Sequence, residues 1–164
     1  SKDPVQDARI HAMLTYRTPA SFSSRFNRTK NNEKKLYNVE SWLAHHGKKL
    51  FNRFTLEAYK SMNHLLSSVD ISRNGKDPKE IIENIKADIH IIAIDSDIFF
   101  TPDEDQKTFE LVKNNKENIF YHEIKSIHGH DAFLIENEIV SKILSKIFNH
   151  ELKIKKKNER SYKE

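Results

Sequence analysis

Two polar residues that could do chemistry follow the two most strand-like stretches of the sequence. Asp97 comes shortly after the β-branched stretch 89–94, and His130 comes shortly after the similar stretch 119–124. Enzymes built on parallel sheets carry their chemistry just beyond the carboxyl ends of the strands. In a catalytic triad the Asp accepts the Nδ1–H of the His, and Nε2 of the His takes and returns the proton of a nucleophile. The sequence therefore predicts the Asp and the His of a triad.

Both residues also have ordinary structural interpretations. An Asp after a strand is often only a turn residue, and a loop His often bonds nearby backbone. His128 lies close to His130 in the sequence. No matching pair of ligands is spaced to complete a zinc site with these histidines, so we expect no metal. Residue type and position alone leave the triad and the structural interpretation open.

A nucleophile for this triad is missing from the sequence. The Ser of such enzymes lies on a Gly-x-Ser-x-Gly turn, and the three glycines, Gly47, Gly75 and Gly129, are too far apart to form one. The absence of cysteine excludes a thiol nucleophile and disulfide bonds, and it favours the cytoplasm. The chain has 164 residues and begins with Ser rather than Met. We therefore expect the C-terminal half of an α/β enzyme, separated from its N-terminal half by cloning, by proteolysis or by a gene break.

The sequence around Asp97 and His130 resembles the homoserine O-acetyltransferases, a family with the α/β-hydrolase fold. Members carry a Ser-Asp or Thr-Asp turn and, further along the chain, Gly-His-Asp-Ala-Phe-Leu. Ser96-Asp97 and residues 129–134 match these motifs. The separation of the Asp and the His, 130 − 97 = 33 residues, is also similar. The resemblance implies an α/β fold class, and specifically the C-terminal part of an α/β-hydrolase.

The N-terminal part of the chain resembles the helical lid of the same family. Members have an Ala-Arg pair followed, at a fixed interval, by a Tyr-Arg pair, and Arg9 and Tyr16 stand at these positions. The interval is nearly two helical turns, so the two side chains share one face of a helix. Likeness covers most of residues 8–148, although Trp42 stands where a smaller aromatic is usual and the lysine-rich tail has no counterpart.

The resemblance implies transfer of an acetyl group from acetyl-CoA to the hydroxyl of L-homoserine through a Ser in the missing half. Asp97 and His130 are then the catalytic residues. Asp131 is expected to face the amino group of homoserine, and Arg9 is expected to bind the carboxylate, with Tyr16 beside it. Acetyl-CoA is a co-substrate in this scheme, and neither a cofactor nor a metal is implied.

The implied substrate residues have alternatives that need no substrate. Arg9 and Tyr16 fit equally well as a rim residue lying along apolar surface and a core aromatic. Asp131 is well placed to cap the last helix, a role that is compatible with substrate binding. His45 and His46 fall on different sides of a helix and cannot chelate together, so we expect His46 in the packed core.

Residues 1–75 are predicted to form a helical lid region. The spacing of apolar residues indicates helices over 4–16, after 19, over 36–51 and from 55 onward, with a polar loop at 27–35. The loop between the last two helices is short, so we expect them to pack antiparallel. Their predicted inward residues are Val39, Trp42, Leu43, His46 and Leu50, and then Leu56, Tyr59, Met62, Leu66 and Val69.

A turn-rich cluster at 72–78 separates the lid from an α/β segment that we assign to residues 76–150. A short helix is indicated over 79–85. The four residues starting at Thr101 form a potential capping box for a helix that ends near 113, and a last helix is predicted from 131 to about 148. Residues 151–164 are assigned to a basic tail, which we expect to be disordered.

Charge and hydropathy narrow the function class. The formal net charge is +4 and the pI is about 9.1, but basic residues are interleaved with acidic ones, which argues against nucleic-acid binding. No apolar run reaches the length of a membrane span, so we expect a cytoplasmic protein without membrane association.

Two alternatives stay open at this point. The same fold could use succinyl-CoA as the donor, because the residues that select the acyl group are expected in the missing half. A different class is a non-catalytic module whose lid helices dimerise and whose site residues are relics. A homodimer through the lid helices is expected in either class.

Overall fold

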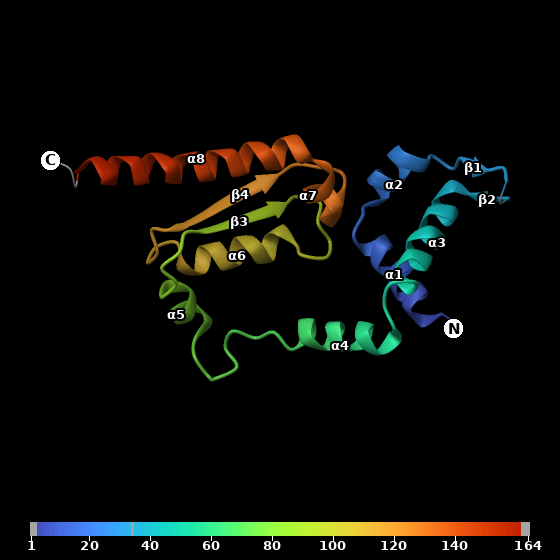
Figure 1. Cartoon of the computed structure of the whole chain (residues 1–164), viewed down its shortest axis with the longest axis horizontal. Coiled ribbons are helices and arrows are strands. Elements are labelled where there is room, and N and C mark those ends of the chain that lie inside the picture. The colour runs from blue at the N-terminus through green and yellow to red at the C-terminus, as the bar shows by residue number, and fades with distance from the viewer. Residues whose placement is uncertain (1–2, 34, 162–164) are drawn as a thin grey trace.

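The computed structural model describes residues 3–33 and 35–161, with side chains described as far as residue 149, and shows a helical region beside a small α/β layer structure (Figure 1). The elements in chain order are α1 (Pro4–Thr15), α2 (Pro19–Phe26), β1 (Lys30–Asn31), β2 (Leu36–Tyr37), α3 (Asn38–Phe51), α4 (Leu56–Ser67), α5 (Pro78–Glu83), β3 (Ile89–Ile94), α6 (Pro102–Val112), β4 (Ile119–Ile124), a 3₁₀ turn η1 (Gly129–Asp131), α7 (Ala132–Ile135) and α8 (Asn137–Ser161).

The strands β3 and β4 pair in parallel and are joined through α6. Their register runs from Ile89 opposite Ile119 to Ile94 opposite Ile124, and their bounds are those predicted from the sequence. Helix α6 covers one face of this sheet and α8 covers the other (Figure 1). Because the strands are parallel and end level with each other, the loops after Ile94 and Ile124 meet at the same edge.

The core of this layer lies between the sheet and α8. Ile94, Ile124 and Ala132 are almost fully buried, and Ile92, Val140 and Ile143 pack against them. The even-numbered residues of both strands point to this side, as the alternation of a pleated strand requires. Burial of these side chains fixes the positions of the strand ends and of the 3₁₀ turn that follows β4.

In the helical region, α3 packs mainly against α1 rather than against α4. Gly47 explains the close approach: a Cβ at this position would lie 2.7 Å from Gln6 Cγ and 2.9 Å from the Gln6 carbonyl oxygen. The predicted antiparallel pairing of α3 with α4 is therefore wrong. The loop between α3 and α4 is short, but two helices pack closely only where small residues lie at the contact. In α3 that residue is Gly47, and it faces α1.

Helix α4 buries none of its residues. The side chains predicted to point inward are instead largely in solvent, with Met62 61%, Leu66 62% and Val69 74% exposed. Nothing in the described part of the chain lies over this apolar face. We call the exposed residues Met62, Leu65, Leu66, Val69 and Ile71 the α4 face.

Several predicted helix boundaries differ in detail from the structure. The loop at 27–35 contains β1, which pairs antiparallel with β2, so the next helix begins at Asn38. Thr101 stands at the N-cap of α6, but its side chain makes no capping hydrogen bond, so the predicted capping box is wrong. Its carbonyl oxygen instead accepts the N–H groups of Glu104 and Asp105.

The predicted last helix is divided into η1, α7 and α8, with a break at Glu136, whose ψ is 50°. Helix α8 then continues to Ser161, well past the predicted end near residue 148. Residues 151–164 were predicted to be disordered, but the structure shows residues 151–161 as part of α8. The Glu, Leu and Lys residues in this stretch have high helix propensity, which favours the helix. Residues 162–164 lie outside the described residues.

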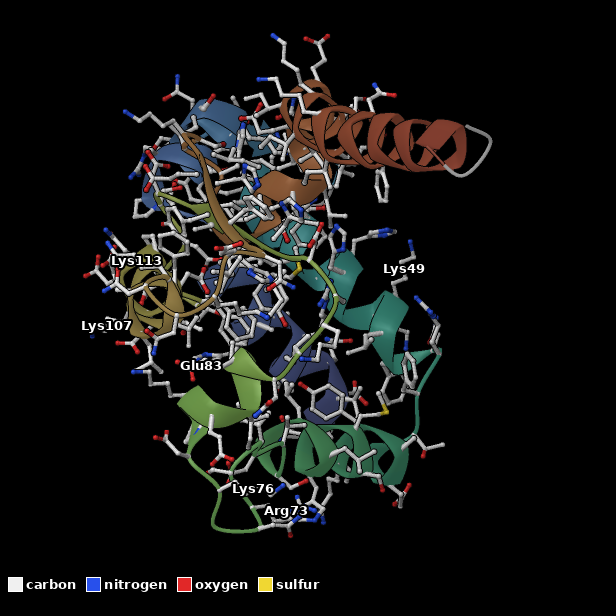
Figure 2. The ribbon with its side chains drawn as sticks, turned by 90° about the vertical axis from the view of Figure 1, so that its left-hand side faces the viewer. Lys49, Arg73, Lys76, Glu83, Lys107 and Lys113 are labelled. Carbon is white, nitrogen blue, oxygen red and sulfur yellow. The ribbon has the colours of Figure 1, made fainter. Side chains whose placement is uncertain are left out.

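Basic side chains are spread over separate elements. Figure 2 shows Lys49 on α3, Arg73 and Lys76 in the loop after α4, Lys107 on α6 and Lys113 at the C-cap of α6. The two lysines of α6 pair with Glu104 and Glu110 of the same helix. Among the residues described, no helix is both long and apolar enough to cross a membrane.

Candidate active site

The structure brings Asp97 and His130 together at the carboxyl edge of the sheet. His130 Nδ1 lies 2.8 Å from Asp97 Oδ2. The other oxygen, Oδ1, accepts the backbone N–H groups of Phe99 at 2.7 Å and Phe100 at 3.0 Å. Both oxygens of the Asp97 carboxylate are therefore held by hydrogen bonds. The residue is 6% exposed, so water has little access to it. This arrangement orients the imidazole and directs Nε2 away from the Asp.

Aromatic rings surround the imidazole of His130. The ring centroids of Tyr16, Phe99, Phe100 and Phe133 lie 5.2 to 5.6 Å from that of His130. Tyr16 comes from the lid, Phe99 and Phe100 come from the loop after β3, and Phe133 comes from α7. These Phe residues are 43–54% exposed, so the site has an apolar wall that is open on one side. Within the described residues, His130 Nε2 has no hydrogen-bond partner, which leaves it available to a nucleophile.

The negative charge of Asp97 affects a second carboxylate nearby. Asp105, in the first turn of α6, is half-buried. Burial raises the pKa of the Asp105 carboxyl, and the negative charge of Asp97 raises it further. The carboxyl of Asp105 is therefore protonated more readily than that of an exposed Asp.

Two serines to which the sequence assigned no role hold the loop of Asp97 against the loop of His130. Ser96 Oγ accepts the N–H of Gly129 at 3.0 Å and donates to the carbonyl oxygen of Ser126. Ser126 Oγ in turn accepts the N–H of His128 at 3.1 Å and donates to Glu136 at 2.7 Å. Ser96 belongs to the Ser-Asp motif of the sequence, but no sequence pattern predicted its bonds to Gly129 and Ser126.

The segment of the lid between α1 and α2 is bound to the His loop. The Tyr16 carbonyl oxygen accepts the N–H of Asp131 at 3.1 Å, and Thr18 Oγ1 donates to the carbonyl oxygen of Ile127. Gly129 has a φ of +63°, and a Cβ there would lie 3.1 Å from the Tyr16 oxygen. Only glycine combines this backbone conformation with this close approach, which gives the Gly-His-Asp motif a structural reason.

A buried Ser and a half-buried His connect the same two segments. Ser21, in the first turn of α2, is 0% exposed, and its Oγ lies 2.8 Å from His128 Nδ1. Complete burial keeps Ser21 away from any substrate, so this Ser–His contact is structural and does not supply the missing nucleophile.

Asp131 forms an ion pair that sequence reasoning missed. Arg17 Nε donates to Asp131 Oδ2 at 2.9 Å, and the two side chains are 10% and 12% exposed. Asp131 precedes α7 at its N-cap position, but its side chain makes no capping hydrogen bond, so the capping interpretation is wrong. The ion pair explains why: one carboxylate oxygen is drawn toward the lid. The only signal in the sequence was the Tyr-Arg pair of the lid motif.

Arg9 lies next to Tyr16 on the lid. Its guanidinium carbon is 5.6 Å from the centre of the Tyr16 ring, which itself contacts the ring of His130. His46, predicted as packed core, is half-buried beside Trp42. Burial lowers the pKa of His46, and the positive charge of Arg9 lowers it further.

Known proteins resemble this chain in both sequence and structure. No family model matches the sequence. The chain is 38% identical over 143 residues to the homoserine O-acetyltransferase of Chloroherpeton thalassium, and 36% identical over 149 residues to that of Nostoc punctiforme. The chain is similar in sequence to a C-terminal portion of the homoserine O-acetyltransferases. The resemblance inferred from the sequence motifs is therefore confirmed.

The likeness to homoserine O-acetyltransferases extends over nearly all of the chain but over a minor part of each relative. It covers 87% and 88% of the chain, but only 36% of the Chloroherpeton protein and 40% of the Nostoc protein. The crystal structure of esterase E22 superposes on 87% of the chain with a TM-score of 0.65 and 13% identity, and the match covers 41% of that esterase. The expected α/β fold class, matching part of an esterase, is confirmed.

Proposed function

We propose that this chain provides the lid, the triad Asp97 and the triad His130 of a homoserine O-acetyltransferase, as the C-terminal portion of the enzyme. The observation that carries the proposal is the geometry of His130. Its Nδ1 is held by a buried carboxylate at 2.8 Å, and its Nε2 has no partner among the described residues. Asp131 follows it directly in the chain, and Tyr16 contacts both its ring and the guanidinium of Arg9.

The first half-reaction needs a Ser that this chain does not carry on a nucleophile turn. His130 Nε2 takes the proton of that Ser hydroxyl as its oxygen attacks the thioester carbonyl of acetyl-CoA. The carbon–sulfur bond then breaks, and the CoA thiol leaves with the proton from His130. Asp97 keeps the proton on Nδ1 and stabilises the imidazolium while it exists. The product is an acetyl ester on the Ser.

In the second half-reaction His130 takes the proton of the homoserine hydroxyl, whose oxygen attacks the acetyl ester. The Ser oxygen leaves and recovers its proton from His130. Asp131 supplies an anionic group for the ammonium of homoserine, and Arg9 supplies a cation for its carboxylate. Tyr16 lies between Arg9 and His130, so it is placed to contact the bound amino acid.

Further parts of the proposal follow from the exposed surfaces and the composition. The α4 face suits a second copy of the lid, so we propose a homodimer formed by these helices. The proposed location is the cytoplasm, which the absence of cysteine favours. Acetyl-CoA is the proposed donor; a succinyl donor is the alternative of the same fold.

The second candidate function is a non-catalytic dimerising module. It is favoured by one observation, the α4 face of exposed apolar side chains, which would dimerise with or without a working site. The two candidates differ in whether the triad residues are needed.

Complementation tests the proposal. The chain is co-expressed with the remaining, unmatched portion of the Chloroherpeton thalassium relative, and release of CoA thiol is followed with acetyl-CoA, with and without homoserine. We expect homoserine-dependent release that falls about a thousandfold or more on His130→Ala. If the co-purified pair shows no such release, or if His130→Ala leaves it unchanged, the acyltransferase proposal fails and the dimerising module is favoured.

A further inference from the structure

We propose that Arg17 is a positioning residue that sets the carboxylate of Asp131 and the loop that carries His130. The catalytic meaning of this role rests on the proposed function, but the structural part stands on the contacts alone. Arg17 is distinct from Arg9, the residue proposed to bind the substrate carboxylate.

The guanidinium of Arg17 is held on three sides by three different elements. Nε donates to Asp131 Oδ2 at 2.9 Å, Nη1 reaches Ser21 Oγ at 3.5 Å, and the guanidinium carbon lies 5.4 Å from the centre of the Trp42 ring. Ser21 in turn contacts His128. Arg17 therefore connects α2 and α3 of the lid to both ends of the short turn that contains His130.

This contact also decides which part of Asp131 remains available. Arg17 occupies Oδ2, and among the described residues Oδ1 accepts no hydrogen bond. A carboxylate fixed through one oxygen presents the other in a single direction, which suits recognition of an ammonium group. Without Arg17, Asp131 would be a nearly buried anion with no partner and would turn toward solvent.

Any movement of Asp131 must also move its neighbour His130. The two are adjacent in η1, and the backbone N–H of Asp131 is bonded to the Tyr16 carbonyl oxygen, next to Arg17. A shift of this turn would change the 2.8 Å contact between His130 and Asp97. Arg17 thus acts on the reaction through Asp131 and His130 and need not touch a reacting atom.

Hydrogen–deuterium exchange of the full chain tests the structural part without requiring activity. We expect Arg17→Gln to raise exchange in the segment 127–135 by about tenfold or more, because an unpaired buried charge promotes local opening. Exchange in the strand 89–94 should be unchanged. The matched control is Arg25→Gln, which removes another cation stacked on Trp42, at 5.2 Å, but has no contact with Asp131 among the described residues.

Unchanged exchange in 127–135 on Arg17→Gln would overturn the proposal. If this variant instead exchanges faster everywhere, the double variant Arg17→Gln with Asp131→Asn is measured, because it removes the unpaired charge. We then expect native exchange in 89–94 with 127–135 still faster than in the unsubstituted chain. Native exchange in both segments of the double variant would show that Arg17 has only a charge-balancing role.

The catalytic part is tested in the complemented enzyme with Arg17→Lys, which keeps the charge but lacks the two-directional fork of the guanidinium. We expect the KM for homoserine to rise about tenfold while acetyl-enzyme formation changes by less than about twofold. Equal loss in both steps would assign Arg17 to general stability. If the complemented enzyme has no activity at all, the proposed function fails, and the exchange experiment still decides the role of Arg17.

Discussion

Replacing Asp97 with Asn tests the central geometry of the site, because the substitution keeps the shape and changes one acceptor into a donor. The Asp97 carboxylate accepts three hydrogen bonds, from His130 Nδ1 and from the N–H groups of Phe99 and Phe100. An Asn side chain has one acceptor oxygen and one donor NH₂. The Asn oxygen can accept either from the two backbone N–H groups or from the Nδ1–H of His130, but not from both sides at once.

The magnitudes favour the backbone. If the amide oxygen turned toward His130, two part-buried N–H donors would be unpaired, at up to about 1–3 kcal/mol each. If the oxygen keeps the backbone bonds, the NH₂ faces Nδ1 and the imidazole carries its proton on Nε2, the wrong tautomer for a general base. In a triad that error costs about ten-thousandfold in turnover, or about 5.5 kcal/mol at about 1.4 kcal/mol per tenfold. We therefore expect a large loss of rate with little loss of stability.

Two measurements check this expectation. Turnover of the complemented enzyme should fall about ten-thousandfold on Asp97→Asn while its Tm stays near that of the unsubstituted protein. Nitrogen NMR of the imidazole should show the His130 proton moved from Nδ1 to Nε2. Asp95→Asn is the matched control: Asp95 Oδ1 accepts the Ser126 N–H at 3.0 Å, and an Asn oxygen can keep that bond. Turnover within about tenfold of the unsubstituted enzyme in Asp97→Asn would refute the triad reasoning.

Three further predictions follow from other parts of the structure. Arg9→Ala should lower kcat/KM for homoserine about ten- to a hundredfold, the worth of one charged contact, while acetyl-enzyme formation is retained; an equal loss in the acetyl-enzyme step would make Arg9 structural. Asp105→Asn should raise the Tm at pH 7, because a folded pKa raised above the usual 3.8 removes stability as pH rises through that window. The gain should vanish below about pH 3.8, and Asp103→Asn, on the same helix turn but exposed, should show no such gain. The chain alone should be inactive with acetyl-CoA and homoserine. By light scattering it should have a mass larger than that of its 19.3 kDa monomer, and Leu66→Glu should reduce that mass. A monodisperse monomer that melts cooperatively would contradict this last prediction.

The strands and the approach of Asp97 to His130 could be predicted because both depend on local patterns. Runs of β-branched residues mark buried strands, and the parallel pairing of two such strands brings the residues that follow them to one edge. The contacts that hold the site could not be predicted in the same way. Arg17 and Asp131 are 114 positions apart, and Ser96 and Gly129 are 33 positions apart. No local spacing shows that such residues meet.

The errors in the helical region have a common physical cause. Helical periodicity shows which side of α4 is apolar, but it does not show what covers that side. The described chain leaves Met62, Leu65 and Leu66 60–62% exposed, and it leaves Phe99, Phe100 and Phe133 open beside His130. Each of these groups lies where the sequence pattern or the site chemistry calls for a partner. The chain spans 36–40% of the Chloroherpeton and Nostoc proteins. In the proposed enzyme, the nucleophile would lie at the open wall beside His130, and a second lid would pack on the α4 face. Substitutions on the α4 face should therefore change assembly and leave the His130–Asp97 contact intact, whereas Phe133→Ala should weaken complementation without changing the size of the assembly.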